Sequence, residues 1–184
     1  MLRARNDGDI GVFEAELYAD VAGWVRASAR PWRPIPPGSP DSPYRAGGDD
    51  SSAPFSALEL ASGDLVGEAV LWGIDPHNRF AHIGLALRPA YRGRGLGTDI
   101  VRVLCRYGFE IRGLNRLQAE TLADNNAMIN AAKRAGFVQE GNLRRSAWVN
   151  GEFADEVILG LLADEWRKTS GTGQVSAHIK KETA

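Results

Sequence analysis

The three alternate glycines of residues 92–97 form the stretch whose spacing could do chemistry. The stretch reads Arg-Gly-Arg-Gly-Leu-Gly, follows a short apolar strand pattern at residues 83–87, and leads into a helical pattern that runs to residue 111. Glycine lets the backbone approach a ligand closely, and the first amides of a helix have no internal partner. The helix dipole adds about half a positive charge at that end. Strand, glycine loop and helix together therefore predict a phosphate-binding anion site.

The spacing of these glycines narrows the choice of phosphate ligand. The dinucleotide fingerprint is Gly-x-Gly-x-x-Gly, which the glycines at 93, 95 and 97 do not match, and the Gly-Lys-Ser/Thr ending of a P-loop is absent. What remains is Arg-x-x-Gly-x-Gly. Taken alone, this loop fits either a phosphate site or a basic turn that caps a helix.

Composition bounds the class of protein. The chain has 184 residues, 43% of them hydrophobic, and a formal net charge of −1, which suits one globular domain and argues against a nucleic-acid partner. No run approaches the ~18 apolar residues of a membrane helix, and the N-terminus does not resemble a signal peptide, so we expect no membrane partner and a cytoplasmic location. The single cysteine, Cys105, excludes an internal disulfide and a cysteine zinc cluster. We expect it to be a buried structural thiol and expect no metal.

Periodicity and turn signals predict an α/β chain with a mixed, mostly antiparallel sheet. The expected strands are residues 1–5, 55–60, 65–74, 79–88, 117–122, 143–149 and 152–162. The expected helices are residues 10–29, divided at Gly23, then 100–111 and 126–135. Strand 117–122 follows a strand–helix crossover, so it should run parallel to strand 83–88. Asn150-Gly151 between apolar runs is a strong hairpin signal.

Residues 30–54 form the irregular part of the chain, rich in Pro, Gly, Ser and Asp. A loop of this length in a small domain is either functional or mobile. It contains Trp32 and Tyr44, which a plain linker would not need. We interpret it as a wall of the acceptor pocket, with a flexible excursion as the alternative. Residues 167–184 are polar and lack apolar periodicity, so we expect a disordered C-terminal tail.

Over residues 1–166 the order of these elements resembles a single domain of the GNAT superfamily of N-acetyltransferases. The nearest branch holds the ribosomal-protein N-terminal acetyltransferases and the spermidine-type acetyltransferases. Supporting pieces, in chain order, are Val66-Gly67-Glu68, the Arg92–Gly97 loop, Asn125-x-x-Met128, Arg134-Ala135-Gly136-Phe137, Asn150-Gly151-x-x-x-Asp155 and Glu165-Trp166.

The resemblance implies an activity and a cosubstrate. An acetyl group would move from acetyl-CoA to a primary amine, either a protein N-terminus or a small amine, by direct attack on the thioester. The flanking helices would cover a sheet that splays between strands 83–88 and 117–122, and the pantetheine arm would lie in that gap. Asn125 would contact this arm, although a helix N-cap is its plainer role. The residues placed against the cofactor are Leu85, Leu87, Arg92, Gly93, Arg94, Gly95, Leu96, Gly97 and Asn125.

Two other functions stay open on the sequence alone. One is a catalytically degenerate acetyl-CoA-binding regulatory module, and the other is an anion-binding structural domain unrelated to CoA. The family often has a tyrosine in the helix near the CoA sulfur, but residues 126–135 contain none. Met128 stands where this branch often has a serine, and it cannot donate a proton. The terminal hairpin and the family's frequent dimers make a homodimer possible.

Proton removal from the amine needs a base or a water chain. His82 lies at the start of the motif strand, where this branch often has a glutamate, and its ordinary pKa near 6.5 suits the task. Glu68, on the neighbouring strand, is the second candidate, whereas Glu140 fits a structural role better. Trp32 and Tyr44 are the candidate residues for acceptor binding.

Overall fold

A seven-stranded sheet organises the part of the chain that the computed structural model describes, residues 1–28 and 30–169. Its strand order is β1-β2-β3-β4-β5-β7-β6. The strands are β1 (Leu2–Ala4), β2 (Ser52–Leu58), β3 (Leu65–Asp75), β4 (Phe80–Leu87), β5 (Arg116–Leu122), β6 (Val138–Val149) and β7 (Glu152–Leu162). The α-helices are α1 (Asp7–Phe13), α2 (Val21–Ala27), α3 (Leu96–Arg106), α4 (Asn126–Arg134) and α5 (Ala163–Thr169).

The pairing of β4 with β5 is parallel, and all other neighbouring strands pair antiparallel. The parallel ladder is short, because only residues 80–82 of β4 meet residues 116–118 of β5. Beyond His82 the two strands separate. This confirms the predicted mixed sheet and its splay between these two strands.

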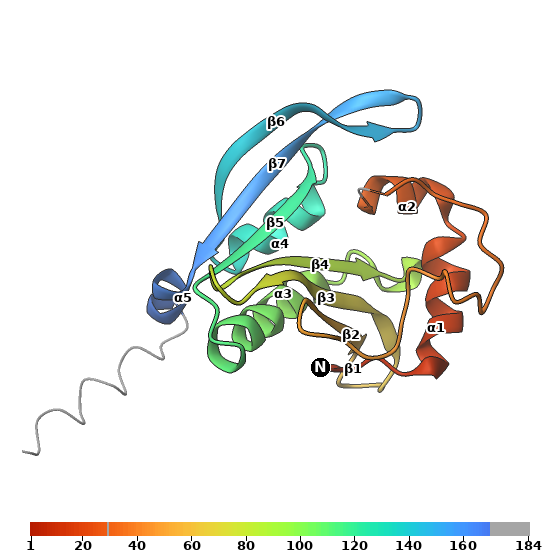
Figure 1. Cartoon of the computed structure of the whole chain (residues 1–184), viewed down its shortest axis with the longest axis horizontal. Coiled ribbons are helices and arrows are strands. Elements are labelled where there is room, and N and C mark those ends of the chain that lie inside the picture. The colour runs from red at the N-terminus through yellow and green to blue at the C-terminus, as the bar shows by residue number, and fades with distance from the viewer. Residues whose placement is uncertain (29, 170–184) are drawn as a thin grey trace, which may run out of the picture.

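The two faces of the sheet are covered by different elements. On one face, Leu71 and Ile83 pack in the main core with Leu104 and Cys105 of α3. Cys105 is fully buried, and burial raises the pKa of its thiol to about 12, as expected for a structural thiol. On the other face, a smaller core surrounds Phe13 of α1. Figure 1 shows α1 and α2 gathered at one end of the molecule, with the β6–β7 hairpin projecting from the sheet.

The first helical region departs from its prediction at both ends. Helix α1 begins at Asp7 rather than at residue 10, because Asn6 caps it in a capping box with Asp9. A π-helical segment, Glu14–Tyr18, continues α1. The division before α2 falls at Asp20 rather than Gly23, because the Asp20 carboxylate accepts a hydrogen bond from the Gly23 amide at 3.0 Å and caps α2.

The C-terminal elements are longer than predicted. The hairpin turn has the expected form, with positive φ at Asn150 (50°) and Gly151 (91°), but β6 begins at residue 138 rather than 143. Residues 167–169 belong to α5, so the prediction of a disordered tail is wrong for them. Trp166 holds this helix against the main core. The rest of the predicted tail, residues 170–184, lies outside the described residues.

No helix within residues 1–28 and 30–169 has the length and apolar character needed to cross a bilayer.

Candidate active site

The second half of β4 exposes an open main-chain edge. Arg88 N donates to Val66 O at 2.9 Å, and antiparallel ladders alternate, so the even-numbered residues of β4 bond to β3. Ile83 and Leu85 therefore turn their N–H and C=O groups towards β5, which has already diverged. An extended ligand arm can pair with such an edge as an added strand would. This geometry suits the predicted contact of Leu85 with the pantetheine arm.

Arg92 ties the glycine loop to the end of β4. Its Nε donates to the Leu87 carbonyl at 3.0 Å, and its guanidinium lies 3.8 Å from the Asp20 carboxylate. The side chain is half-exposed. The Leu87 carbonyl oxygen thus already accepts a hydrogen bond, which leaves the Leu87 N–H as the group available for the predicted contact with a ligand.

The glycine loop presents bare backbone to solvent. Gly93 and Gly95 have φ values of 76° and 80°, and a Cβ built at either position would meet no atom within 4 Å. Gly95 is the N-cap of α3 and supplies no capping side chain. Within the described residues, no acceptor is assigned to the amides of Arg94 and Gly95. Free amides at a helix start, with open space before them, fit the pyrophosphate of acetyl-CoA.

Side chains in this loop have other partners. The Arg94 guanidinium lies 2.6 Å from the Glu59 carboxylate and 5.5 Å from the Tyr91 ring centroid. Leu96 packs against the main core, and a Cβ at Gly97 would lie 3.7 Å from Ala131. The loop would therefore act on a ligand through its backbone. The predicted cofactor contacts of Arg92, Gly93, Arg94, Gly95, Leu96 and Gly97 stay predictions.

Asn125 caps α4 on the far side of the gap. Its Oδ1 accepts from the Met128 amide at 3.2 Å, and its Nδ2 donates to Thr121 Oγ1 at 2.8 Å. The capping role is confirmed. One amide N–H of the Asn125 side chain is left for a ligand, and its predicted contact with acetyl-CoA stays a prediction.

His82 lies at the apex of the gap, in the last residue pair that joins β4 to β5. Its ring stacks on Trp72, with centroids 4.1 Å apart, and meets the edge of Phe80 at 4.7 Å. Burial lowers the pKa of His82 below its ordinary 6.5, which the Glu120 carboxylate opposes and the Arg116 guanidinium reinforces. The imidazole is therefore held neutral near pH 7, as a general base must be.

Glu68 lies on the same face as His82 but far along the ladder. It pairs across with Ala86, four residues from His82, or roughly 13 Å at about 3.3 Å per residue. Its carboxylate forms an ion pair with the buried Arg5 guanidinium. Burial raises the pKa of Glu68, and Arg5 opposes this shift. The two predicted bases thus cannot serve one amine together, and Glu68 already has a structural partner.

The two candidate acceptor residues pack in the smaller core. Tyr44 is only 3% exposed and lies 5.5 Å from the Phe13 ring, so its position is that of a packing residue. Trp32 is half-buried; it stacks on Tyr18, and its Nε1 donates to the Tyr18 carbonyl at 3.0 Å. These contacts anchor the irregular loop to the π-helical segment. Direct contact of either residue with an acceptor stays a prediction.

All four tyrosines of the chain lie outside α4. Tyr18 donates to Arg33 O at 2.7 Å, Tyr44 is buried, and Tyr91 lies beside the Arg88 and Arg94 guanidinium groups. Tyr107 packs on Phe55. The described part of α4 therefore offers no phenol to the gap, in agreement with the sequence.

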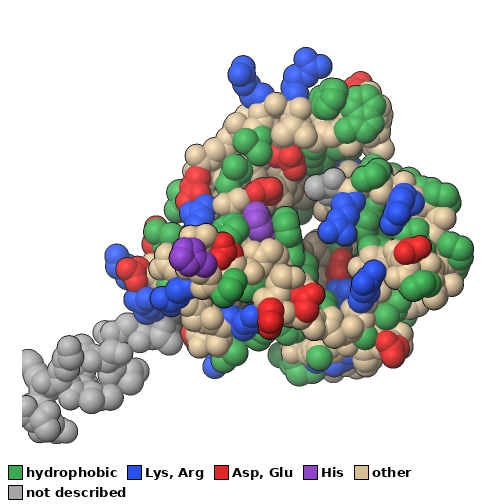
Figure 2. All heavy atoms as spheres, viewed as in Figure 1, with side chains coloured by type: hydrophobic (Ala, Val, Ile, Leu, Met, Phe, Trp, Pro, Cys, Tyr) green, Lys and Arg blue, Asp and Glu red, His purple; other side chains and the backbone are tan. Residues whose placement is uncertain are grey.

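Helix α2 spans the open end of the gap, which the sequence did not indicate. Arg26 forms a 2.7 Å ion pair with Asp124 after β5, and Asp20 approaches Arg92 after β4. The helix thus joins the ends of the two diverging strands. Figure 2 shows the surface hollowed between this segment and the β6–β7 hairpin, with charged side chains of both signs around the hollow.

Glu120 is a further feature of the site, after helix α2, that sequence reasoning missed. Its Oε1 lies 3.8 Å from His82 Nδ1. Gln118 and Glu120 are the polar positions of an alternating strand, and that strand was expected beside the one that carries His82. The combination of polar alternation with parallel pairing was therefore a usable signal.

Comparison with known proteins agrees with this geometry. A family model described as "Acetyltransferase (GNAT) domain" matches residues 1–138. The putative ribosomal N-acetyltransferase YdaF of Bacillus subtilis is 36% identical over 107 residues, 58% of each chain. The spermidine N(1)-acetyltransferase of Vibrio cholerae is 24% identical over 113 residues, 61% of this chain and 65% of that one.

Among solved structures, spermidine N-acetyltransferase from Vibrio cholerae in complex with CoA and spermine superimposes with a TM-score of 0.72. The identity is 19%, and the match covers 90% of this chain and 96% of that one. At this identity the likeness shows the fold.

The chain thus combines a splayed sheet with a glycine loop at a helix start. The chain belongs to the GNAT acetyltransferase family. Its match to YdaF spans less than two thirds of that relative's length.

Proposed function

We propose that the protein is an acetyl-CoA-dependent N-acetyltransferase that moves an acetyl group to a primary amine. The observation that carries this proposal is the gap beyond His82, where β4 keeps a free main-chain edge beside a loop of bare backbone amides. The free edge of β4 would pair with an extended arm, and the loop amides would bind a pyrophosphate. Together they fit CoA, and membership of the GNAT family supports the same ligand.

Different residues of the chain would have different roles in the proposed reaction. Acetyl-CoA, when bound, supplies an activated acetyl thioester. The amides of residues 93–97 would hold the pyrophosphate, and the Leu85 main chain would align the arm and donate to the thioester carbonyl oxygen. His82 would take the proton of the attacking amine, because its neutral imidazole lies at the apex of the gap. Helix α4 has no tyrosine, and Met128 has no proton to donate, so solvent would protonate the leaving thiolate.

The acceptor is a protein N-terminus or a small amine. The names of relatives support both classes: one is a putative ribosomal N-acetyltransferase, and others are spermidine N(1)-acetyltransferases. We place the acceptor in the hollow between α2 and the hairpin, with the loop anchored by Trp32 as one wall. A homodimer and a cytoplasmic location are part of the same proposal, and light scattering after gel filtration would test the dimer.

Two assays on the full chain test the function. Isothermal titration with acetyl-CoA, CoA and ATP should show binding of the first two and much weaker binding of ATP, because only CoA has an arm that fills the gap. Thiol release should then be measured over a panel of polyamines, amino acids and short peptides. Acetyl-CoA binding without release for any amine would favour a catalytically degenerate CoA-binding module.

A further inference from the structure

The imidazole of His82 is held in one orientation by its neighbours. Trp72 lies almost parallel to it, at 13° between ring planes, and Phe80 meets it at 80°. Only 18% of the side chain is exposed. The ring therefore has little room to rotate.

The two ring nitrogens of His82 have different surroundings. Nδ1 is sealed from solvent and has no hydrogen-bond partner, and the Glu120 carboxylate at 3.8 Å is the ionisable group that faces it. Nε2 is not among the sealed atoms without a partner, and its edge of the ring lies beside Gly73, where a Cβ would come within 3.9 Å of Nε2. A small rotation of the Glu120 side chain would shorten the distance from its carboxylate to Nδ1, and such contacts often tighten only when substrate binds.

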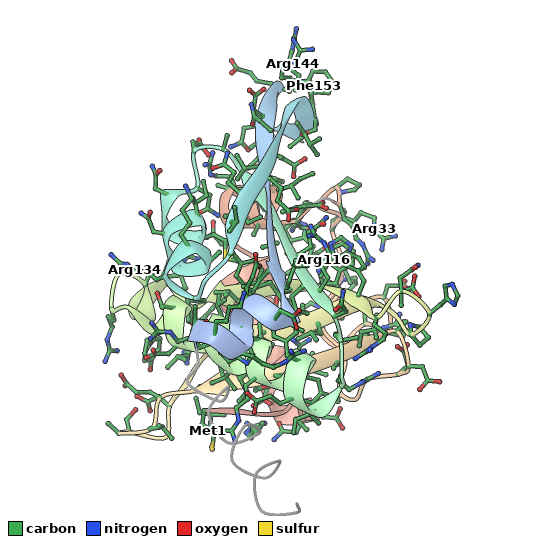
Figure 3. All side chains as sticks on the ribbon, turned by 90° about the vertical axis from the view of Figure 1, so that its left-hand side faces the viewer. Met1, Arg33, Arg116, Arg134, Arg144 and Phe153 are labelled. Atoms are coloured by element: carbon green, nitrogen blue, oxygen red, sulfur yellow. The ribbon has the colours of Figure 1, made fainter. Side chains whose placement is uncertain are left out.

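A directional row of hydrogen bonds along β5 holds Glu120 in place. Arg116 pairs with both carboxylate oxygens of Glu140 and donates to Gln118 Oε1 at 3.0 Å. Because a guanidinium has only donors, Gln118 must turn its oxygen to Arg116 and its Nε2 to Glu120. The Gln118 amide then donates to Glu120 Oε1 at 2.5 Å. Figure 3 places Arg116 near the body of the sheet, apart from Arg144 and Phe153 at the end of the hairpin.

We propose that Glu120 is a positioning residue for His82: its carboxylate accepts the Nδ1 proton, so that the lone pair of Nε2 faces the acceptor amine. This rests on the proposed function. The proton lost by the amine goes to Nε2, and the resulting imidazolium keeps its Nδ1–H on Glu120. The imidazolium then returns the proton to solvent, and no oxidation or reduction is involved.

The charged groups that face His82 set the sign of the effect. Both come from β5, with Glu120 raising the pKa of the imidazole and Arg116 lowering it, while burial lowers it most. The β3 and β4 neighbours, Trp72 and Phe80, carry no charge. Removing the Glu120 charge should therefore lower the pKa of His82 further and make it a weaker base.

The test substitutes Glu120→Gln and uses Glu152→Gln, an exposed carboxylate at the hairpin turn, as the matched control. Glu120 is about one-third exposed, so the variant should fold. Nitrogen-15 NMR of the ring nitrogens can follow His82 directly, because the chain has three histidines and His82→Ala identifies its signals. We expect neutral His82 in wild type and in the control to carry its proton on Nδ1.

In Glu120→Gln we expect the Nδ1-protonated form to lose its dominance and the pKa of His82 to fall. The acid limb of the pH–rate profile should move to lower pH with it. The kcat should fall about 10-fold, a part of the ~10²-fold contribution of a general base, at unchanged KM for acetyl-CoA. An unchanged tautomer and pKa in Glu120→Gln would overturn the proposal. The NMR result needs no acceptor, so a protein that acetylates nothing would refute the proposed function while the spectra still decide the His82–Glu120 pair.

Discussion

At the residue scale, the proposed reaction needs a base at the apex of the gap, and the side chain of this base must be uncharged before the amine binds. His82 meets this condition because burial lowers its pKa. Burial has the opposite effect on Glu68, because it raises the pKa of this carboxyl, and the carboxylate already forms an ion pair with Arg5. Two ionisable residues on one face of the sheet therefore have different roles: the first can accept a proton and the second joins two strands.

Substituting His82→Ala should lower kcat by roughly 10²-fold, the contribution of a general base. Activity requires the neutral imidazole, so in wild type the rate should rise with pH through the pKa of His82, which lies below 6.5. The pH–rate profile of the variant should lack this limb. Met128→Leu is the matched control and should leave kcat almost unchanged, because neither side chain carries a proton. Full activity and an unchanged profile in His82→Ala would assign the base to water or another residue.

Gly95→Ala should weaken CoA binding by about 10-fold or more, equivalent to ~1.4 kcal/mol, because its methyl group would stand before the first amides of α3. Gly93→Ala should weaken CoA binding as well, since both glycines have φ near 80° and both Cβ positions are open in the same loop. The two variants should lose similar stability, of order 1–2 kcal/mol for a left-handed residue.

Calorimetric titration with CoA and thermal unfolding together separate these effects. Arg94→Ala is the matched control and should bind CoA almost normally, because its guanidinium is paired with Glu59. Equal small losses of CoA affinity in Gly95→Ala, Gly93→Ala and Arg94→Ala would show that the loop backbone does not hold the pyrophosphate.

At the scale of elements, the segment after β1 is fastened to β3 by a buried charge. The Arg5 side chain is 3% exposed and that of Glu68 is 19% exposed, and the guanidinium also lies over the Phe13 and Tyr44 rings. This cluster sits under the irregular loop. It therefore positions the acceptor side of the sheet without contacting the gap itself.

Glu68→Ala should destabilise the fold by about 3 kcal/mol, because it leaves the Arg5 charge buried without a partner. Asp124→Ala breaks an ion pair whose side chains are 43% and 68% exposed, so it should cost less than ~1 kcal/mol. Urea unfolding of both variants would measure the difference. If Glu68→Ala unfolds like wild type yet loses kcat, then Glu68 acts in the chemistry and the structural assignment is wrong.

At the scale of the whole molecule, local sequence signals predicted most of the fold. Alternate glycines before an amphipathic run mark the start of α3, and Asn150-Gly151 marks the hairpin turn. The crossover rule then fixed β5 parallel to β4. The first two features depend on residues close together in the chain, and the third follows from the order of strand, helix and strand, which is why one sequence was enough to predict them.

Features that depend on packing between distant segments were harder to predict. The proximity of Glu120 to His82 depends on the register of two strands whose paired residues, such as His82 and Gln118, are 36 positions apart. Tyr44 looked like a pocket residue because its burial against Phe13 is a tertiary contact. Residues 167–169 were expected in the tail but belong to α5, whose Trp166 packs in the main core.

Amide hydrogen exchange of the full chain with and without CoA tests the central claim most directly. If the arm lies on the free edge of β4 and the pyrophosphate on the loop, CoA should slow exchange at residues 83–87 and 93–97, while the hairpin tip at residues 150–151 stays unchanged. Tight CoA binding that leaves both segments unprotected, with protection elsewhere, would contradict the account.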